Sequence, residues 1–307
     1  MAERSNDLVV IGAGVAGLTA ATLAAKHGLT TFCAEEQMFG GLVLNIGELD
    51  PAPAARPAQG AELAAGLMEE AAAAGVTYSG EAVHRVSPDG PMFRVETAGE
   101  VVVARTVVIA SGARPKLLGV PGEQEFEHRG VAHCADCDAA FYAGQDVVVA
   151  GGGNSALQEA LVLIRQCKTV FIVHRGSSLT AHPRFVDAIS RHPNIQLVTR
   201  ATVREIRGAA GVESVLVQGE EGAVREIGCT GVFPYIGLQP NTSFLPAGMA
   251  CDEHGFLRTN DRLEASLAGT YAIGAVRSGF GGSLDDAFVD GERVIDALQS
   301  RHQGVDA

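Results

Sequence analysis

Two residues separate Cys134 from Cys137 near the middle of the chain, and Asp138 follows directly. Cysteines at this spacing can close a small disulfide ring, and a thiolate in such a pair suits thiol-disulfide exchange. A carboxyl group at Asp138 can donate and accept the proton that moves when a dithiol opens and closes. His133, next to Cys134, is a candidate for lowering the pKa of a thiol in this pair. The pattern predicts a redox-active dithiol with Cys134, Cys137 and Asp138 as catalytic residues.

Half of a structural zinc site is the alternative interpretation of a cysteine pair. Zinc needs four ligands, and the chain offers no second Cys-x-x-Cys and no histidine pair at ligand spacing. We therefore expect no metal. The remaining cysteines, Cys33, Cys167, Cys229 and Cys251, lie singly and are expected to be core or surface thiols.

The composition indicates a globular α/β protein. The 307 residues leave room for two domains, 47% are hydrophobic, and 38 are glycine. A net charge of -13 argues against nucleic acid or an anionic membrane as partner. The polar first residues argue against a signal peptide, and no apolar run reaches spanning length. We expect a cytoplasmic protein.

The first nucleotide-binding signal follows a short apolar strand at residues 8–11. Gly12, Gly14 and Gly17 form the pattern Gly-x-Gly-x-x-Gly, and an alanine-rich segment to about His27 is typical of a helix. The glycines let the backbone approach a pyrophosphate, and the helix N-terminus favours its negative charge. This order of strand, turn and helix predicts a dinucleotide site.

An acidic residue completes the first site. The next strand, residues 30–34, ends at Glu35, where a carboxylate can hydrogen-bond ribose hydroxyls. Glu36 is the alternative if the strand ends one residue later. Gly40 and Gly41 follow where the chain would pass the same nucleotide, and an ordinary turn is the other interpretation of this pair.

A second site repeats this architecture. An apolar strand at residues 147–150 precedes a glycine turn and another apolar helical stretch. The candidate residues of this turn are Gly151, Gly153, Asn154, Ser155 and Ala156, with alanine in the third glycine place.

The ribose-reading position of the second site carries no carboxylate. The spacing from Gly12 to Glu35 equals that from Gly151 to His174, so His174 and Arg175 occupy this position. A carboxylate would favour NADH, whereas a basic residue can meet the 2′-phosphate of NADPH. The charge here favours NADPH.

The chain crosses between the two domains twice. A strand near residues 107–110, followed by Gly112, returns to the first domain, and the chain leaves it at a proline. We expect one domain of residues 1–115 and 242–307 and a second of residues 116–241. The predicted fold class is α/β, with two Rossmann-like three-layer domains, the first of them discontinuous.

Further elements fill these domains. Strands are expected near residues 169–173, 195–198 and 213–217 in the second domain. A strand at 270–274 and a helix at 285–298 complete the first.

The order of the motifs indicates a family. Between and after the two fingerprints stand Ala-Ser-Gly-Ala-Arg-Pro at 110–115, Gly-Val-Pro-Gly at 119–122, the Cys-x-x-Cys-Asp, and Gly-Leu-Gln-Pro-Asn-Thr at 237–242. Over essentially its whole length the chain resembles the bacterial low-molecular-weight thioredoxin reductases. The likeness extends to their disulfide-reductase and dithiol-oxidase relatives.

The resemblance implies a homodimer with one FAD per chain, bound by the discontinuous domain, and an NAD(P)-binding-like domain that carries the cysteines. It implies that Cys137 faces the flavin, that Cys134 exchanges with the substrate disulfide, and that Asp138 transfers protons. Rotation of the smaller domain, with hinges at the crossovers, would bring nicotinamide and dithiol to the flavin in turn. The substrate would be a thioredoxin-like protein or a small-molecule disulfide. The FAD-binding residues would be Gly12, Gly14, Gly17, Glu35, Gly40, Gly41, Gly112, Gly274, Ala275 and Asp286.

Three departures from the family accompany the resemblance. The family's basic NADPH segment, His-Arg-Arg followed by another Arg, reads His-Arg-Gly-Ser-Ser-Leu-Thr-Ala at 174–181. The family's Gly-Asp, whose carboxylate holds the FAD ribityl chain, reads Gly274-Ala275. The following loop, 278–283, is about two residues longer than the family's, and Asp286 falls near a family glutamine.

The leading hypothesis is an FAD-dependent disulfide reductase in which NAD(P)H reduces FAD, FAD reduces the cysteine pair, and the dithiol reduces a disulfide. The missing arginines leave open a ferredoxin-linked reductase or a dithiol oxidase that passes electrons to oxygen. A flavin-binding regulatory protein without turnover is a third hypothesis, which loss of turnover in Cys137→Ser would exclude. A thiol-free flavin reductase is a fourth, and it predicts that Cys134→Ser leaves activity unchanged.

Overall fold

The computed structural model of the protein describes residues 2–49, 53–54, 56–220 and 222–305. The chain divides into two compact units, Met1–Arg114 with Gln239–Ala307, and Pro115–Leu238. Two short paired strands, β7 (Ala113–Pro115) and β15 (Leu238–Pro240), mark the two passages of the chain from one unit to the other. The first unit is therefore discontinuous, and the α/β class is confirmed.

The first unit is built on one mixed sheet in the order β3-β2-β1-β6-β5-β4, with β16 pairing with β6. Pairings among β1, β2, β3, β6 and β16 are parallel, whereas β4, β5 and β6 form an antiparallel meander. The bounds are β1 Ala2–Ile11, β2 Thr31–Ala34, β3 Thr77–Ser79, β4 Arg85–Asp89, β5 Met92–Glu96, β6 Glu100–Ile109, β16 Thr270–Ala272, α1 Val15–Lys26, α2 Gly60–Ala73 and α6 Leu284–Val305, with 3-10 turns at Gly41–Asn45 and Gly274–Val276.

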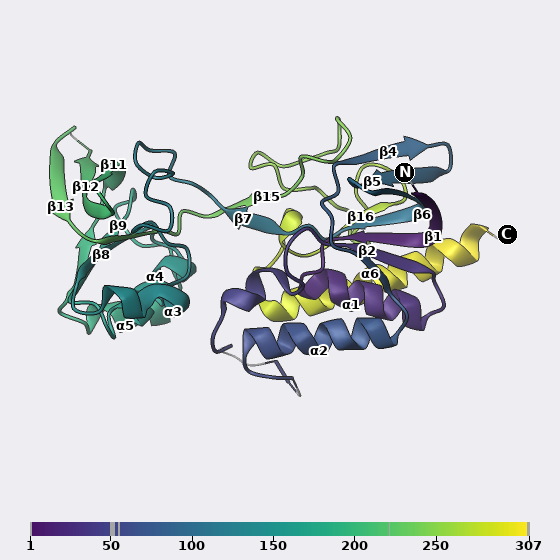
Figure 1. The fold of residues 1–307 in the computed structure, drawn as a ribbon, viewed down its shortest axis with the longest axis horizontal. Helices are drawn as coiled ribbons and strands as arrows, with labels where there is room; N and C mark the ends of the chain where they lie inside the picture. The colour runs from purple at the N-terminus through teal and green to yellow at the C-terminus, as the bar shows by residue number, and fades with distance from the viewer. Residues whose placement is uncertain (1, 50–52, 55, 221, 306–307) are drawn as a thin grey trace. The chain divides into compact units, whose positions relative to one another are not determined.

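Strand β1 shows why this sheet is buried on both faces. Leu8 and Val10 pack with the helices, whereas Val9 and Ile11 belong to the core on the opposite face. All four are at most 4% exposed, as expected for a central parallel strand. Helices α1, α2 and α6 run side by side along one face of the sheet (Figure 1).

The second unit combines a parallel sheet, order β10-β9-β8-β14, with an antiparallel sheet, order β11-β12-β13. The side chains of β8 alternate between two cores: Val147 and Val149 pack with the helices, and Val148 and Ala150 pack against the second sheet. The bounds are β8 Asp146–Ala150, β9 Thr169–Val173, β10 Ile195–Val198, β11 Ala201–Gly208, β12 Val212–Gly219, β13 Val224–Gly228, β14 Gly231–Pro234, α3 Ala135–Asp138, α4 Asn154–Leu163 and α5 Pro183–Ser190, with a 3-10 turn at Ala139–Tyr142. No helix within the described ranges is long and apolar enough to cross a bilayer.

Candidate functional site

The predicted cysteine pair forms a closed disulfide. Cys134 and Cys137 are bridged, with their Cα atoms 5.3 Å apart. Cys134 caps α3, and its Sγ accepts a hydrogen bond from the Cys137 N–H at 3.1 Å. The Asp138 N–H donates to the Cys134 carbonyl at 3.1 Å, which closes the turn. Cys137 is exposed and Cys134 half-buried, so a reagent in solvent can reach the bridge. Among the residues that the structure describes, no cluster of three or more His, Cys, Asp or Glu side chains could hold a metal ion.

A half-buried carboxyl group supports this turn from α4. One oxygen of Glu159 accepts a hydrogen bond from the Ala135 N–H at 3.1 Å. Burial raises the pKa of Glu159, the hydrogen bond from Ala135 opposes the shift, and the negative charge of Asp136 adds to it. The Tyr235 hydroxyl donates to the His133 carbonyl at 3.2 Å, and burial also raises the pKa of Tyr235.

Sequence analysis missed Glu159 and Tyr235. Glu159 occupies the same helical face as Ala156 and Leu163, both buried. A lone charge on an apolar helical stripe was the one signal available for it. Tyr235 carried no such signal.

Two glycines of the first turn, Gly12 and Gly17, leave no room for a side chain. Gly12 has φ +103°, and a Cβ atom there would lie 2.4 Å from the Ala110 carbonyl oxygen. A Cβ atom on Gly17 would lie 2.0 Å from the Gly12 carbonyl oxygen. Gly14 caps α1 and forms a bridge with Gly40, whose N–H donates to the Ala13 carbonyl at 2.8 Å.

Glu35 lies against this turn. One of its carboxylate oxygens accepts a hydrogen bond from the Ala13 N–H at 2.8 Å, and the other from the Gln37 N–H at 2.9 Å. Gly41 also lies close to this turn, because a Cβ atom on it would lie 3.3 Å from the Gly14 Cα. A close-approach backbone beside a carboxylate fits the pyrophosphate and ribose of a dinucleotide, and a contact of Glu35 with the ribose stays a prediction.

Two further predicted residues have structural partners of their own. Gly112 has φ +65°, and its carbonyl accepts the Asn241 N–H at 3.0 Å. Asp286 accepts the Ser283 N–H at 2.9 Å, while Ser283 Oγ accepts the Asp286 N–H at 3.1 Å. This reciprocal pair caps the start of α6, and its hydrogen bonds lower the pKa of Asp286. A contact of Asp286 with the flavin stays a prediction.

The Gly274–Ala275 turn lies beside α1 and is held by a buried ion pair. A Cβ atom on Gly274 would lie 3.1 Å from the Ala16 Cβ. The Gly274 N–H donates to Asp290 at 2.9 Å, and Asp290 pairs with two nitrogens of Arg277 at 2.6 and 2.8 Å. Ala275 carries no carboxylate. Asp290, which the sequence did not indicate, provides one at the Gly274 N–H.

The loop that begins at His174 covers the second glycine turn. A Cβ atom on Gly152 would lie 2.3 Å from the His174 Nδ1, and the His174 Nε2 lies 3.0 Å from the Ser178 carbonyl oxygen. Asn154 accepts the His182 N–H at 2.7 Å. Arg175 is exposed. His174 is thus held against the turn, and Arg175 is the residue of the predicted pair that extends into solvent. The other turn residues are Gly151 with φ +146°, Gly153 as the cap of α4, and Ser155 and Ala156 within α4.

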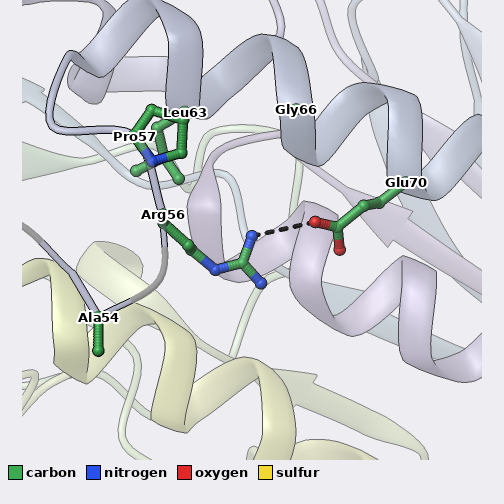
Figure 2. Close-up of a pocket in the computed structure, with 6 residues that line it drawn as sticks. All are labelled: Ala54, Arg56, Pro57, Leu63, Gly66 and Glu70. Atoms are coloured by element: carbon green, nitrogen blue, oxygen red, sulfur yellow. Dashed lines mark hydrogen bonds and ion pairs between the residues drawn. The ribbon is translucent and has the colours of Figure 1, made fainter.

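A pocket of about 370 Å³ lies in the first unit, lined by Ala54, Arg56, Pro57, Leu63, Gly66 and Glu70. Figure 2 shows the Arg56 guanidinium directed toward Glu70, at 3.2 Å. The same guanidinium lies 4.7 Å from the centre of the Phe288 ring. Because its cation is already paired and the glycine turns and cysteines are not among its lining, we do not assign the chemistry to this pocket.

Gly17→Ala tests the first turn. The added methyl group would collide with the Gly12 carbonyl, so we expect a loss of about 1–3 kcal/mol in stability and about tenfold or more in FAD affinity. Fluorescence titration of the apoprotein with FAD measures the affinity. Gly66→Ala is the matched control, because a Cβ atom there meets nothing within 4 Å. Equal FAD affinity in the two variants would contradict the assignment.

Comparisons with known proteins agree on one family. A family model described as pyridine nucleotide-disulphide oxidoreductase matches residues 6–300. A thioredoxin reductase of Treponema pallidum is 36% identical over 278 residues, 90% of each chain. The thioredoxin reductase of Bacillus subtilis is 36% identical over 301 residues, 97% of this chain and 95% of that one. A crystal structure of Lactococcus lactis thioredoxin reductase superposes with a TM-score of 0.90 at 31% identity, covering 96% of this chain and 98% of the other.

Proposed function

Because this chain belongs to the pyridine nucleotide-disulphide oxidoreductase family and is a flavin-dependent disulfide oxidoreductase of the thioredoxin reductase type, we propose that it reduces a thioredoxin-like protein with electrons from NADPH. The closed and partly exposed Cys134–Cys137 disulfide is the observation that carries the proposal. A small-molecule disulfide is the alternative substrate.

The cysteines have separate roles in this proposal. Cys137 receives electrons from the flavin, and Cys134 attacks the substrate disulfide. The hydrogen bond from the Cys137 N–H to the Cys134 Sγ supports this division, because an amide donor stabilises a thiolate on the attacking sulfur. Asp138 holds the proton that one sulfur releases and takes up.

FAD bound in the first unit would supply two-electron transfer between the nicotinamide and the disulfide. In the proposal the first glycine turn and Glu35 bind its pyrophosphate and ribose, with Gly40 and Gly41 alongside. Gly112, Gly274, Ala275 and Asp286 would hold the flavin half. The nicotinamide cofactor binds at Gly151, Gly153, Asn154, Ser155 and Ala156, with His174 and Arg175 at the ribose.

The surroundings of the enzyme are also part of the proposal. Cys33, Cys167 and Cys229 are buried unpaired thiols and Cys251 is an exposed one, which fits a reducing, cytoplasmic compartment. A homodimer follows from the family resemblance, and analytical ultracentrifugation tests it.

A nicotinamide-independent enzyme is the second candidate. It is favoured by the second turn, where His174 packs on Gly152 and Arg175 is the one basic side chain at the 2′-phosphate position. A ferredoxin-linked reductase or a dithiol oxidase would keep the flavin and the cysteine pair while using another electron partner.

An anaerobic absorbance titration with NADPH, then NADH, then a dithiol separates the two candidates. We expect NADPH to bleach the flavin band and thiolate-flavin charge-transfer absorption to follow. Bleaching by the dithiol alone would overturn the NADPH proposal and favour the second candidate.

A further inference from the structure

The backbone of the disulfide turn is tied to a carboxyl group from another helix. Glu159 on α4 accepts the N–H of Ala135, the residue that follows Cys134. Ala135 is fully buried, so the hydrogen bond reaches the ring closed by the disulfide and not a flexible flank. Glu159 is therefore coupled to the geometry of the reacting pair.

Most of the charged groups around Glu159 are acidic. Asp136 of α3 repels its negative charge, and the nearby Tyr235 hydroxyl acts in the opposite direction on the pKa of Glu159. The same hydroxyl donates to the carbonyl of His133, whose Nε2 lies 3.2 Å from Glu127. Around the turn, carboxylates thus outnumber cationic partners.

This setting makes Glu159 sensitive to a new negative charge. Burial already raises its pKa, and the charge of Asp136 acts in the same direction. Opening the disulfide to one thiol and one thiolate adds an anion to the turn. A nearby anion moves the pKa of a carboxyl group further upward, which favours proton uptake.

We propose that Glu159 is a positioning residue of the dithiol, which holds the turn through the Ala135 amide and takes up a proton when reduction leaves a thiolate there. The inference rests on the proposed function, since it takes Cys134 and Cys137 as the reacting pair. With a dithiol reductant, the protein S–S bond breaks and the reductant forms its own S–S bond, so two electrons pass to the protein. Of the two protons that the reductant releases, one goes to a cysteine sulfur and one to Glu159.

Glu159→Gln tests this proposal in the FAD-loaded protein. Glutamine keeps an acceptor for the Ala135 N–H but cannot take up a proton. The readout is the rate of iodoacetamide alkylation of the reduced pair against pH, measured by mass spectrometry of the peptides. Without the carboxylate we expect the thiolate to form at lower pH, with about tenfold more thiolate at a given pH below the midpoint.

The proton count distinguishes this role from a merely structural one. The pH dependence of the dithiothreitol equilibrium gives the number of protons taken up per disulfide reduced. This number falls from two toward one as the pH rises. We expect the fall to occur at lower pH in Glu159→Gln than in the wild type.

Two further variants make the result decisive. Tyr235→Phe removes a nearby hydroxyl that lowers the pKa of Glu159, so we expect a smaller shift in the same direction. Glu205→Gln is the matched control, because Glu205 pairs on the surface with Arg207 at 2.9 Å and should leave the titration unchanged.

If folded Glu159→Gln and Tyr235→Phe titrate as the wild type does, this inference is overturned while the proposed function stands. If Glu159→Gln does not fold, the titration of Tyr235→Phe decides. A wild-type disulfide that dithiothreitol leaves intact at every pH would overturn the proposed function and this inference together.

Discussion

Cys137→Ser is expected to lower the rate of disulfide reduction by a factor on the order of 10³ or more, while NADPH still bleaches the flavin. The variant cannot form the Cys134–Cys137 bridge, so electrons that reach the flavin have no protein disulfide to reduce. Stopped-flow absorbance separates the two half-reactions, because flavin bleaching reports the first and consumption of a substrate disulfide reports the second.

Cys251→Ser is the matched control for this substitution. Cys251 is an exposed, unpaired thiol of the first unit, and its loss should leave both half-reactions unchanged. Retention of disulfide reduction in Cys137→Ser would show that the cysteine pair is not on the electron path and would favour a thiol-free flavin reductase.

Asp290→Ala is expected to lower the free energy of unfolding by about 3–5 kcal/mol. The Asp290 side chain is 2% exposed and that of Arg277 12%, so the substitution leaves a guanidinium with little access to water and no anion. It also removes the acceptor of the Gly274 N–H, which is part of the predicted FAD site. We therefore expect weaker FAD retention together with the lost stability.

Denaturant unfolding followed by circular dichroism measures the loss of stability. Glu100→Ala is the control, because Glu100 pairs with Arg4, whose side chain is 46% exposed, and an ion pair of that kind contributes about 0–1 kcal/mol. A change below about 1 kcal/mol in Asp290→Ala would mean that water or a shifted side chain compensates Arg277.

Much of the fold could be predicted because its signals are local. The strands expected at 169–173 and 195–198 have those bounds in the structure, since each is a short apolar run between turn residues. The antiparallel sheet of β11, β12 and β13 was recognised only in its middle strand. In β13 four of the five residues are exposed, so the strand has little apolar pattern to detect, and pairing with β12 defines it.

The sequence by itself determined the cysteine pair and the two glycine turns. Both depend on neighbours along the chain: two intervening residues set the disulfide ring, and strand, glycines and helix follow one another at each turn. Glu35 could be predicted for the same reason, since the end of the next parallel strand places it beside the first turn.

Tertiary structure alone decided what surrounds these motifs. Glu159 meets Ala135 across 24 positions of sequence, and Asp290 reaches Arg277 and Gly274 from a separate helix. Such contacts depend on how helices pack on a sheet, which no local spacing encodes. Burial then gives them their strength, because a carboxylate removed from water must find its hydrogen bonds and countercharge within the protein.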